Sequence, residues 1–264
     1  MIKTKVIGRV FRQDEIADQI YDMWIETELA QGARPGQFVC VYTKNAAALL
    51  PRPISICEVN EEKTMLRLVY RTVGTGTNEF AAYHAGTEIS LLGPLGNGFP
   101  VEKAAGKRVF LIGGGIGIPP MLQLSKEIKK AGQAYCELSV LGYRNELFLN
   151  TDLEKYSQIY VATEDGSAGT KGTVLDAIKE KGLSGDVIFA CGPMPMLRAI
   201  KEYAAANNME AYISLEEHMA CGVGACLGCV CKTKNVDAHS HVHNSRICTC
   251  LLYTSPSPRD MRRS

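Results

Sequence analysis

Residues 109–132 read VFLIGGGIGIPPMLQLSKEIKKAG, and this stretch predicts a strand, a glycine turn and a helix in direct succession. The apolar run before Gly113 suits a buried strand, and apolar residues then recur every three or four positions, the spacing of one helical face. Pro120 is well placed in the first turn of a helix, and Gly132 is typical of a helix end. A strand, a turn and a helix in this order are the repeating unit of a parallel sheet covered by helices.

The chain continues in the same rhythm as far as residue 215. Further strands are predicted at 135–142, 159–165, 187–192 and 211–215, with helices that begin at Thr173 and Pro193. Strands that alternate with helices imply a parallel sheet with both faces covered. We therefore expect a parallel-sheet, nucleotide-binding α/β domain over residues 101–215.

Residues 1–100 follow a different pattern, in which short strands are separated by turn residues. Leu66, Leu68 and Tyr70 alternate with other side chains at the period of a half-buried strand. The six predicted strands are 5–11, 21–28, 37–43, 54–59, 65–72 and 88–92, with a short helix at 78–83. We expect a closed, antiparallel, six-stranded barrel that ends at the turn-rich residues 93–100.

The composition excludes several classes of protein. The chain has 264 residues, with 46% hydrophobic and 22% charged side chains, which is an ordinary globular mixture. A net charge of +1 gives no excess of basic side chains of the kind that binds a nucleic acid or an anionic membrane surface. The longest uncharged stretch, residues 109–125, is interrupted by glycine and proline and does not predict a membrane-spanning helix. The first residues lack an apolar signal core, so a cytoplasmic location is expected.

Cysteines are concentrated near the end of the chain, where six of the ten lie in residues 221–250. Cys221, Cys226 and Cys229 have the C-x4-C-x2-C spacing of a plant-type [2Fe–2S] site, whose fourth cysteine lies further along. The glycines between them carry no Cβ, which lets the loop wrap closely and direct N–H groups toward sulfur. We expect a small C-terminal [2Fe–2S] cysteine domain over residues 216–250.

Spacing alone leaves the fourth ligand and the metal open. Cys248 and Cys250 both follow at a suitable distance, whereas Cys231 points to the opposite side if its segment is extended. A structural zinc site is the alternative, although such sites usually pair two C-x2-C knuckles and only one is present. Three histidines are predicted to alternate along a solvated hairpin strand rather than to bind metal: His239, His241 and His243.

The α/β domain offers two candidate positions. A glycine turn between strand and helix can bind phosphate, because N–H groups at a helix start attract anions, and here the turn contains Gly113, Gly115 and Gly117. The dinucleotide fingerprint is imperfect, since Pro120 replaces its third glycine and the next strand ends without an acidic residue, so a tight structural turn is the alternative. Cys191 ends a strand at the carboxyl edge of the sheet, where ligands bind, with a buried inert thiol as the alternative.

The barrel offers a third candidate position. Arg52 lies just before one predicted strand and Ser55 lies on it, Arg71 lies near the end of another, and the glycine-rich residues 74–77 precede the short helix, with Thr77 predicted as its cap. Singly, these residues mean little, because arginines at strand edges are usually solvated. Together they supply two guanidinium groups, a hydroxyl and a helix start, which suit a diphosphate and a flavin ring.

Four motifs occur in a fixed order along the chain. They are RPIS at 52–55, GGGIGIPP at 113–120, CGPMPML at 191–197 and CGVGACLGC at 221–229. With the predicted barrel and sheet, they resemble the ferredoxin-reductase superfamily and, within it, the family of electron transfer subunits of dihydroorotate dehydrogenase B. The resemblance extends from about residue 3 to Cys248.

This resemblance implies three bound groups. FAD is expected at Arg52, Pro53, Ile54, Ser55, Val69, Tyr70, Arg71, Gly76 and Thr77. NAD is expected over Gly113, Gly114, Gly115 and Gly117, with Cys191 beside the nicotinamide as the catalytic residue. A [2Fe–2S] cluster is expected on Cys221, Cys226, Cys229 and Cys248.

The resemblance also implies a partner and a reaction. The partner is an FMN-bearing dihydroorotate dehydrogenase catalytic subunit, in a heterotetramer with two copies of each chain. Electrons pass from its FMN through the cluster and FAD to NAD⁺ in pyrimidine biosynthesis. One alternative is the flavin and iron–sulfur subunit of a ferredoxin- or sulfide-linked NADP(H) oxidoreductase, and a remoter one is a non-enzymatic iron–sulfur or zinc redox sensor.

The end of the chain departs from the family pattern. The family usually continues through an acidic Gly-Pro turn into a final strand, whereas this chain reads CLLYTSPSPRDMRRS from Cys250. Its Ser, Pro and Arg content without periodicity predicts a disordered or non-native tail over residues 251–264.

Overall fold

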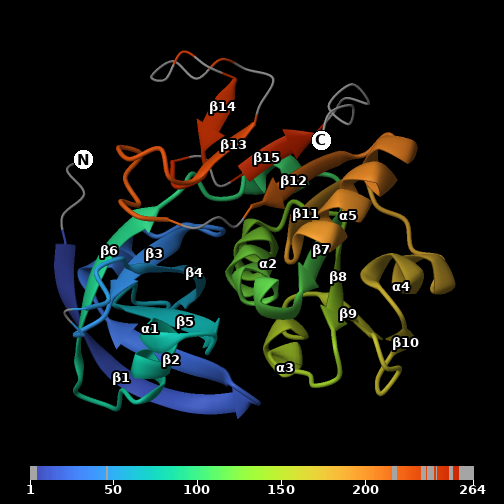
Figure 1. The fold of residues 1–264 in the computed structure, drawn as a ribbon. Coiled ribbons are helices and arrows are strands. Elements are labelled where there is room, and N and C mark those ends of the chain that lie inside the picture. Colours follow the sequence, from blue (N-terminus) through green and yellow to red (C-terminus); the bar gives the residue numbers. More distant parts are fainter. Residues whose placement is uncertain are drawn as a thin grey trace.

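The computed structural model describes residues 5–45, 47–215, 219–232, 236, 241, 243–249 and the backbone of 252–255. A β-barrel and an α/β domain lie side by side, and the cysteine-rich segment lies over the barrel (Figure 1). None of the helices in these ranges is long and apolar enough to cross a bilayer. Helix α2 (Pro119–Ala131) of the α/β domain contacts strand β4 (Arg52–Val59) of the barrel.

The barrel is closed, six-stranded and antiparallel, so the predicted architecture is confirmed. Besides β4, its strands are β1 (Lys5–Ala17), β2 (Ile20–Glu26), β3 (Phe38–Tyr42), β5 (Met65–Arg71) and β6 (Glu88–Leu95). Their order around the barrel is β1-β2-β5-β4-β3-β6. Ile25, Leu66 and Leu91 are fully buried in its core, to which the alternating pattern directs them.

The short helix of the barrel begins earlier than predicted. The sequence predicts residues 78–83, but α1 spans Thr75–Ala81. The Thr77 hydroxyl accepts hydrogen bonds from the backbone N–H groups of Val73 and Gly74, at 2.9 and 3.3 Å. Thr77 is therefore the third residue of the helix rather than its cap, and it ties the preceding loop to the first turn.

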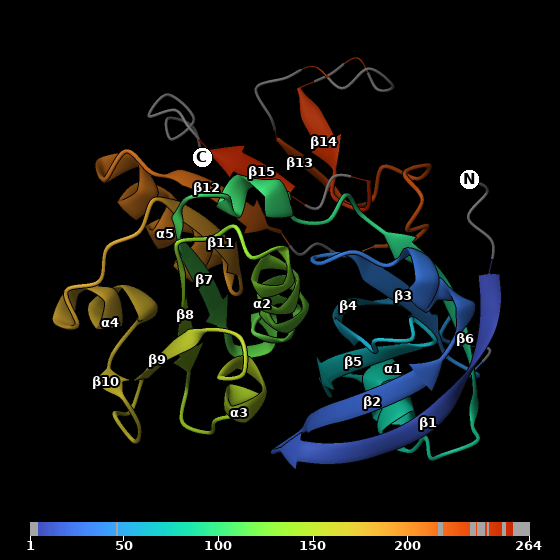
Figure 2. The ribbon, with the colours of Figure 1, turned by 180° about the vertical axis from the view of Figure 1, so that it is seen from behind.

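The α/β domain contains the predicted parallel sheet, in the order β10-β9-β8-β7-β11-β12. Its strands are β7 (Arg108–Gly114), β8 (Cys136–Tyr143), β9 (Gln158–Thr163), β10 (Thr170–Lys171), β11 (Val187–Cys191) and β12 (Glu210–Ser214). Helices α2 and α3 (Asn150–Leu153) cover one face, and α4 (Val174–Glu180) and α5 (Met194–Ala206) cover the other (Figure 2). Apolar clusters on both faces explain why these strands read as nearly continuous hydrophobic runs.

The tail contains an element that the sequence does not predict. Leu252–Ser255 forms strand β15, which pairs antiparallel with β12 at the edge of the sheet. The expectation of a tail without structure is therefore wrong for these four residues. Without β15, the outer edge of β12 would present unpaired backbone groups, and such an edge is a ready template for another strand.

The cysteine-rich segment is anchored on the barrel by an apolar cluster. Its members are Met219, Cys229, Ile247 and Cys248 with Phe38, Cys40, Leu92 and Leu95 of β3 and β6. The segment contains a small hairpin of β13 (Val230–Lys232) and β14 (Asn244–Arg246). His241 and His243 are exposed and precede β14, so the prediction that they lie on a strand is wrong, while His239 lies outside the described residues. His241 has a φ of 55°, which is incompatible with an extended strand.

Candidate functional site

Backbone N–H groups of the cysteine loop point at the sulfur of Cys221. The donors, 3.3 to 3.4 Å from its Sγ, are Val223, Ala225 and Cys226. Burial acts to raise the pKa of Cys221, but hydrogen bonding from these groups outweighs it and lowers the pKa to about 6. Because the thiolate is the form of cysteine that binds metal, the loop is suited to present Cys221 as a ligand.

Two glycines of this loop are required by its shape. Gly222 has a φ of 68°, and a Cβ there would lie 2.8 Å from Cys40 Sγ in the barrel wall. Gly224 has a φ of 84°, and a Cβ there would lie 2.7 Å from Thr249 Cγ2. A side chain at either position would strain the backbone and push the loop away from its neighbours. The tight wrapping inferred from the glycine content is therefore present.

The four cysteines expected to bind the cluster lie as two pairs. Cys221 and Cys226 interact through their side chains, and so do Cys229 and Cys248. Within the described ranges, no three His, Cys, Asp or Glu side chains are arranged around one metal ion. A [2Fe–2S] cluster takes two cysteine sulfurs on each of its two irons, so two pairs fit it better than they fit a single tetrahedral zinc.

The two pairs differ in their surroundings. Cys226 is exposed and Cys221 partly exposed, whereas Cys229 and Cys248 are buried against the barrel. Burial, followed by the hydrogen bond to Cys229, raises the pKa of Cys248 to about 12. The rival fourth ligand, Cys250, lies outside the described residues. The pair formed by Cys221 and Cys226 therefore faces outward and the other pair faces the barrel.

The residues expected to bind FAD converge from three elements of the barrel. Residues 52–55 form the start of β4, residues 69–71 form the end of β5, and Gly76 lies in the first turn of α1. The Arg52 guanidinium lies against the backbone of Gly76, where any Cβ would collide with it. Nε of Arg71 is buried without a hydrogen-bond partner among the described residues. Two guanidinium groups on these elements, one with an uncommitted donor, suit a diphosphate.

The geometry of the glycine turn in the α/β domain is compatible with both of its interpretations, a phosphate-binding turn and a tight structural turn. It follows β7 and forms a single turn of 3-10 helix, Gly115–Gly117, before α2. A Cβ at Gly117 would collide with the carbonyl of Cys191, so this glycine serves close packing. Gly115 has a φ of 52° and open space beside it, so the backbone there is accessible to a ligand.

Cys191 lies at the base of this turn. It ends β11, is fully buried, and is paired in the sheet with Gly113 on one side and Ser214 on the other. The strand edge thus brings Cys191 and the glycine turn together, as the topology predicts. Its contact with a nicotinamide stays a prediction.

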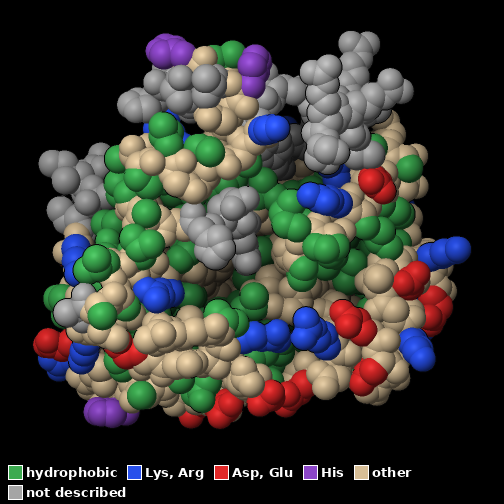
Figure 3. Space-filling model, in the orientation of Figure 1, with side chains coloured by type: hydrophobic (Ala, Val, Ile, Leu, Met, Phe, Trp, Pro, Cys, Tyr) green, Lys and Arg blue, Asp and Glu red, His purple; other side chains and the backbone are tan. Residues whose placement is uncertain are grey.

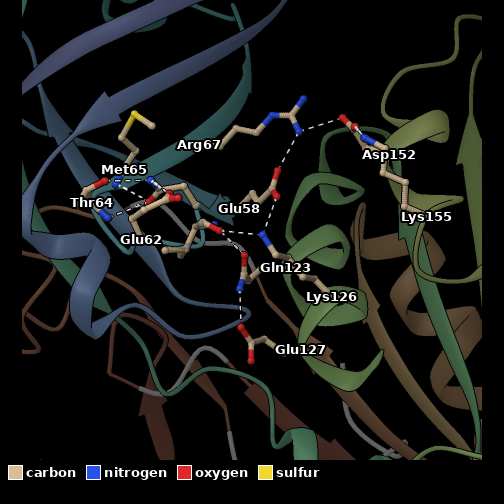
Figure 4. Close-up of polar contacts among 12 residues, drawn as sticks. Glu58, Glu62, Thr64, Met65, Arg67, Gln123, Lys126, Glu127, Asp152 and Lys155 are labelled. Carbon is tan, nitrogen blue, oxygen red and sulfur yellow. Dashed lines mark hydrogen bonds and ion pairs between the residues drawn. The ribbon is translucent and has the colours of Figure 1, made fainter. Parts of the chain in front are cut away.

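Three features near the sites were not predicted from the sequence. Cys40 lies beneath the cysteine loop, where burial, followed by the proximity of Cys221 and Cys229, raises its pKa to about 12. A network of charged side chains joins the barrel to the α/β domain (Figure 4). A cavity of about 690 Å³ at the same junction contains none of the predicted cofactor residues. No local pattern marks any of these, because each depends on which segments meet in space.

Comparison with known proteins first defines the class. Residues 111–202 match the family described as "Oxidoreductase NAD-binding domain". The fold is similar to a chain from the structure of an NADH-dependent reduced ferredoxin-NADP oxidoreductase, with a TM-score of 0.83, 27% identity, and coverage of 94% of this chain and 88% of that one. A ferredoxin reductase of carbazole 1,9a-dioxygenase shares the fold at a TM-score of 0.66 and 16% identity, over 79% and 67% of the two chains. The molecule is an oxidoreductase of the ferredoxin-reductase type.

Closer relatives then define the family. Residues 216–249 match the "Iron-sulfur cluster binding domain of dihydroorotate dehydrogenase B". The chain is 43% identical over 231 residues to the dihydroorotate dehydrogenase B (NAD(+)) electron transfer subunit of Geobacillus sp. (strain WCH70), covering 86% of this chain and 88% of the relative. The chain is 41% identical over 245 residues to the same subunit of Shouchella clausii (strain KSM-K16), covering 91% of this chain and 92% of the relative. The chain belongs to the family of dihydroorotate dehydrogenase B electron transfer subunits.

Proposed function

We propose that this chain carries electrons from an FMN-bearing dihydroorotate dehydrogenase catalytic subunit to NAD⁺, through a [2Fe–2S] cluster and FAD. The observation that carries the proposal is the position at which the cysteine loop packs on the barrel. Buried Cys229 and Cys248 pack on Cys40 of β3, and Cys40 is paired in the sheet with Pro53, one of the expected FAD residues. One strand therefore separates the inner cysteine pair from the strand assigned to the flavin.

The order of the three parts suits the chemistry. A nicotinamide exchanges a hydride, an iron–sulfur cluster exchanges single electrons, and a flavin, when bound, does both. The barrel has the cysteine segment on β3 and β6 and helix α2 beside β4. The residues of this chain then need no general acid or base, because their tasks are to bind, to orient and to exclude water.

Residue assignments follow the same logic. We assign Arg52 and Arg71 to the diphosphate of FAD, supported by the contact of Arg52 with Gly76 and by the uncommitted Nε of Arg71. The remaining expected FAD residues belong to the same three elements of the barrel. We assign the NAD pyrophosphate to the accessible backbone around Gly115, with Cys191 at the base of that site.

The partner surface is proposed around the outer cysteine pair. Val223, Leu227 and Val230 are 41%, 44% and 38% exposed beside Cys226. Figure 3 shows hydrophobic side chains gathered over this part of the molecule. Apolar side chains left in water beside a redox site suit a stable protein interface. A heterotetramer with two of each chain belongs to the proposal, as does a cytoplasmic location, which suits the free thiols of the nine described cysteines.

Reconstitution with the catalytic subunit from the same source tests the function. The isolated chain should oxidise NADH with an artificial acceptor but should not oxidise dihydroorotate. Adding the catalytic subunit should create NAD⁺-dependent formation of orotate. Turnover of dihydroorotate by the isolated chain would contradict the proposal, as would a failure of the two proteins to co-purify under all conditions tried. A clear preference for NADPH would instead support an NADP(H)-linked oxidoreductase, the class of the structural neighbour with a TM-score of 0.83.

A further inference from the structure

A largely buried set of ion pairs joins the barrel to the α/β domain (Figure 4). Arg67 on β5 donates two hydrogen bonds to Asp22 on β2, from Nε at 2.9 Å and from Nη2 at 2.8 Å. Its Nη1 lies 3.1 Å from Glu58 on β4 and reaches Asp152 on α3 of the other domain at 2.9 Å. The side chains of Arg67 and Asp22 are only 9% and 5% exposed, so water screens these contacts weakly.

Helix α2 is tied to the same end of β4. Lys126 Nζ donates hydrogen bonds to Glu58 Oε1 at 3.0 Å and to the carbonyl of Val59 at 3.1 Å. Gln123 Oε1 accepts a hydrogen bond from the N–H of Val59 at 2.7 Å. The pairing of β4 with β5 shifts register between Ile56 and Glu58, and such bulges redirect backbone groups at the end of a strand.

These contacts lie on the elements that carry both assigned nucleotide sites. Strand β4 opens with FAD residues and ends at Glu58 and Val59, and β5 carries Arg67 just before its own FAD residues. Helix α2 begins directly after the glycine turn and carries Gln123 and Lys126. At about 3.3 Å per strand residue and about 1.5 Å per helix residue, the assigned residues of each site lie roughly 7–20 Å from the ion pairs along a stiff element.

Apolar packing also joins the two domains, but it does not fix their orientation. Cys57 and Val69 of the barrel belong to one cluster with Ile118 and Met121 of the α/β domain. The hydrophobic effect is non-directional, whereas a bidentate pair between arginine and carboxylate holds in one geometry only. If α2 slid along β4, the carboxylate of Glu58 would lose its ion pair with Lys126 while remaining poorly hydrated, and such an unpaired charge is strongly unfavourable.

We propose that an interdomain clamp sets the position of the nicotinamide relative to the flavin. Its members are Glu58, Arg67, Gln123, Lys126 and Asp152. They are positioning residues, because none of them is among the expected cofactor contacts, and the inference rests on the function proposed above. The step concerned moves one hydride, with its two electrons, between nicotinamide and flavin, and it needs reacting atoms about 3–3.5 Å apart.

Lys126→Met tests the clamp, because it removes the ammonium group and keeps the apolar stem. We expect kcat for NADH oxidation with an artificial acceptor to fall about ten-fold, and KM for NADH to change less than about two-fold, because misplacement slows the chemical step without removing a binding contact. Lys130→Met is the matched control on the same helix, since Lys130 is exposed, and it should retain wild-type kinetics. Lys126→Arg should recover most of kcat.

Asp152→Asn is a second variant in case Lys126→Met lowers the yield of folded protein. It preserves the shape of the side chain and removes the charge that faces Arg67 at 2.9 Å and Lys155 at 2.7 Å. We expect a smaller fall in kcat in the same direction, again with little change in KM.

Hydrogen exchange on the full chain supplies a readout that is independent of turnover. The end of β4 and the residues of α2 should exchange faster in Lys126→Met than in Lys130→Met. The clamp proposal is overturned if Lys126→Met retains the kcat of Lys130→Met, or if it raises KM and leaves kcat unchanged. Failure of the proposed function would look different, because it would appear in the wild-type chain itself, as turnover of dihydroorotate without the catalytic subunit or as no oxidation of NADH.

Discussion

The barrel contacts its two neighbours through different kinds of surface. Toward the cysteine segment, Phe38, Leu92 and Leu95 pack with Met219 and Ile247 in an apolar cluster. Toward the α/β domain, apolar packing is accompanied by the ion pairs of the clamp. The same barrel is therefore joined to one side mainly by burial and to the other by burial with directional charge contacts.

This difference matches what each junction has to achieve. An iron–sulfur site needs buried surroundings and hydrogen bonds to sulfur, which tune its potential. Hydride transfer needs aligned atoms, which burial alone does not ensure. We infer that charged groups are placed where orientation matters and apolar groups where exclusion of water matters, and the following predictions test this distinction.

The largest expected effect is the loss of the cluster. Cys226→Ala should abolish iron binding and cluster absorbance while FAD stays bound, because the cysteine loop and the assigned FAD residues are separate segments of the chain. Iron and flavin counted per chain in anaerobically purified protein measure both. Cys231→Ala is the control and should be nearly silent, and an equal iron content in Cys226→Ala and wild type would refute the ligand assignment.

Weakening the apolar junction comes next in size. Leu95, the last residue of β6, is fully buried in the apolar cluster shared with the cysteine segment. Leu95→Ala should lower the free energy of unfolding by about 2–5 kcal/mol, because it leaves a cavity in a packed cluster. Chemical denaturation measures this, and iron release should precede flavin release. Ile7→Ala, at a position 62% exposed on β1, should change stability by less than about 0.5 kcal/mol, and an equal effect in both variants would contradict the picture of an apolar anchor.

A third prediction concerns β4, the strand to which we assign FAD residues and which lies between the two junctions. Arg52→Ala should weaken FAD binding by about 1.5–3 kcal/mol, the range for a hydrogen bond to a charged group. Titration of the cofactor-depleted chain with FAD measures the change in Kd. Arg9→Ala, an exposed barrel arginine, is the matched control. Unchanged flavin retention in Arg52→Ala would count decisively against the diphosphate assignment.

The smallest expected effect lies within the α/β domain, on its strand β8. Burial raises the pKa of Glu137 on β8 to about 7, although a hydrogen bond from the Ser125 hydroxyl at 3.1 Å opposes the shift. The folded chain therefore holds a proton that the unfolded chain releases near pH 4.5, and stability falls as pH rises from there through about 7.

Glu137→Gln should remove this pH dependence. As pH rises from 4 to 8, the free energy of unfolding of the variant should increase by on the order of 1 kcal/mol relative to that of wild type. This value is reduced for the partial exposure of the side chain. Denaturation midpoints across that range measure the difference, with the exposed Glu154→Gln as control. A constant difference between Glu137→Gln and wild type at all pH values would show that Glu137 does not titrate as expected.

Local patterns in the sequence were sufficient for the elements and for the chemistry they carry. Alternation along residues 65–72 predicted β5, the glycine turn before Pro119 predicted the start of α2, and the glycines between the cysteines predicted a loop with N–H groups directed at sulfur. Each of these depends on residues within a few positions of one another, so periodicity and backbone sterics decide them. The boundary of α1 was missed because Thr77 bonds the N–H groups of the preceding loop from within the first turn, whereas the sequence pattern placed it before the helix as a cap.

Only the tertiary structure decided which distant segments meet. Cys40 lies under a loop that begins 181 positions later, and Arg67 contacts Asp152 across 85 positions of sequence. Cys248 is placed beside Cys229 by the apolar cluster on the barrel, whereas spacing left Cys248 and Cys250 equivalent. Such contacts follow from the closure of the barrel and from how the domains pack on it, and the residues involved carry no local signal of their partners. The sequence by itself therefore determined what the chain can bind, and the packing of its parts determined how those sites face one another.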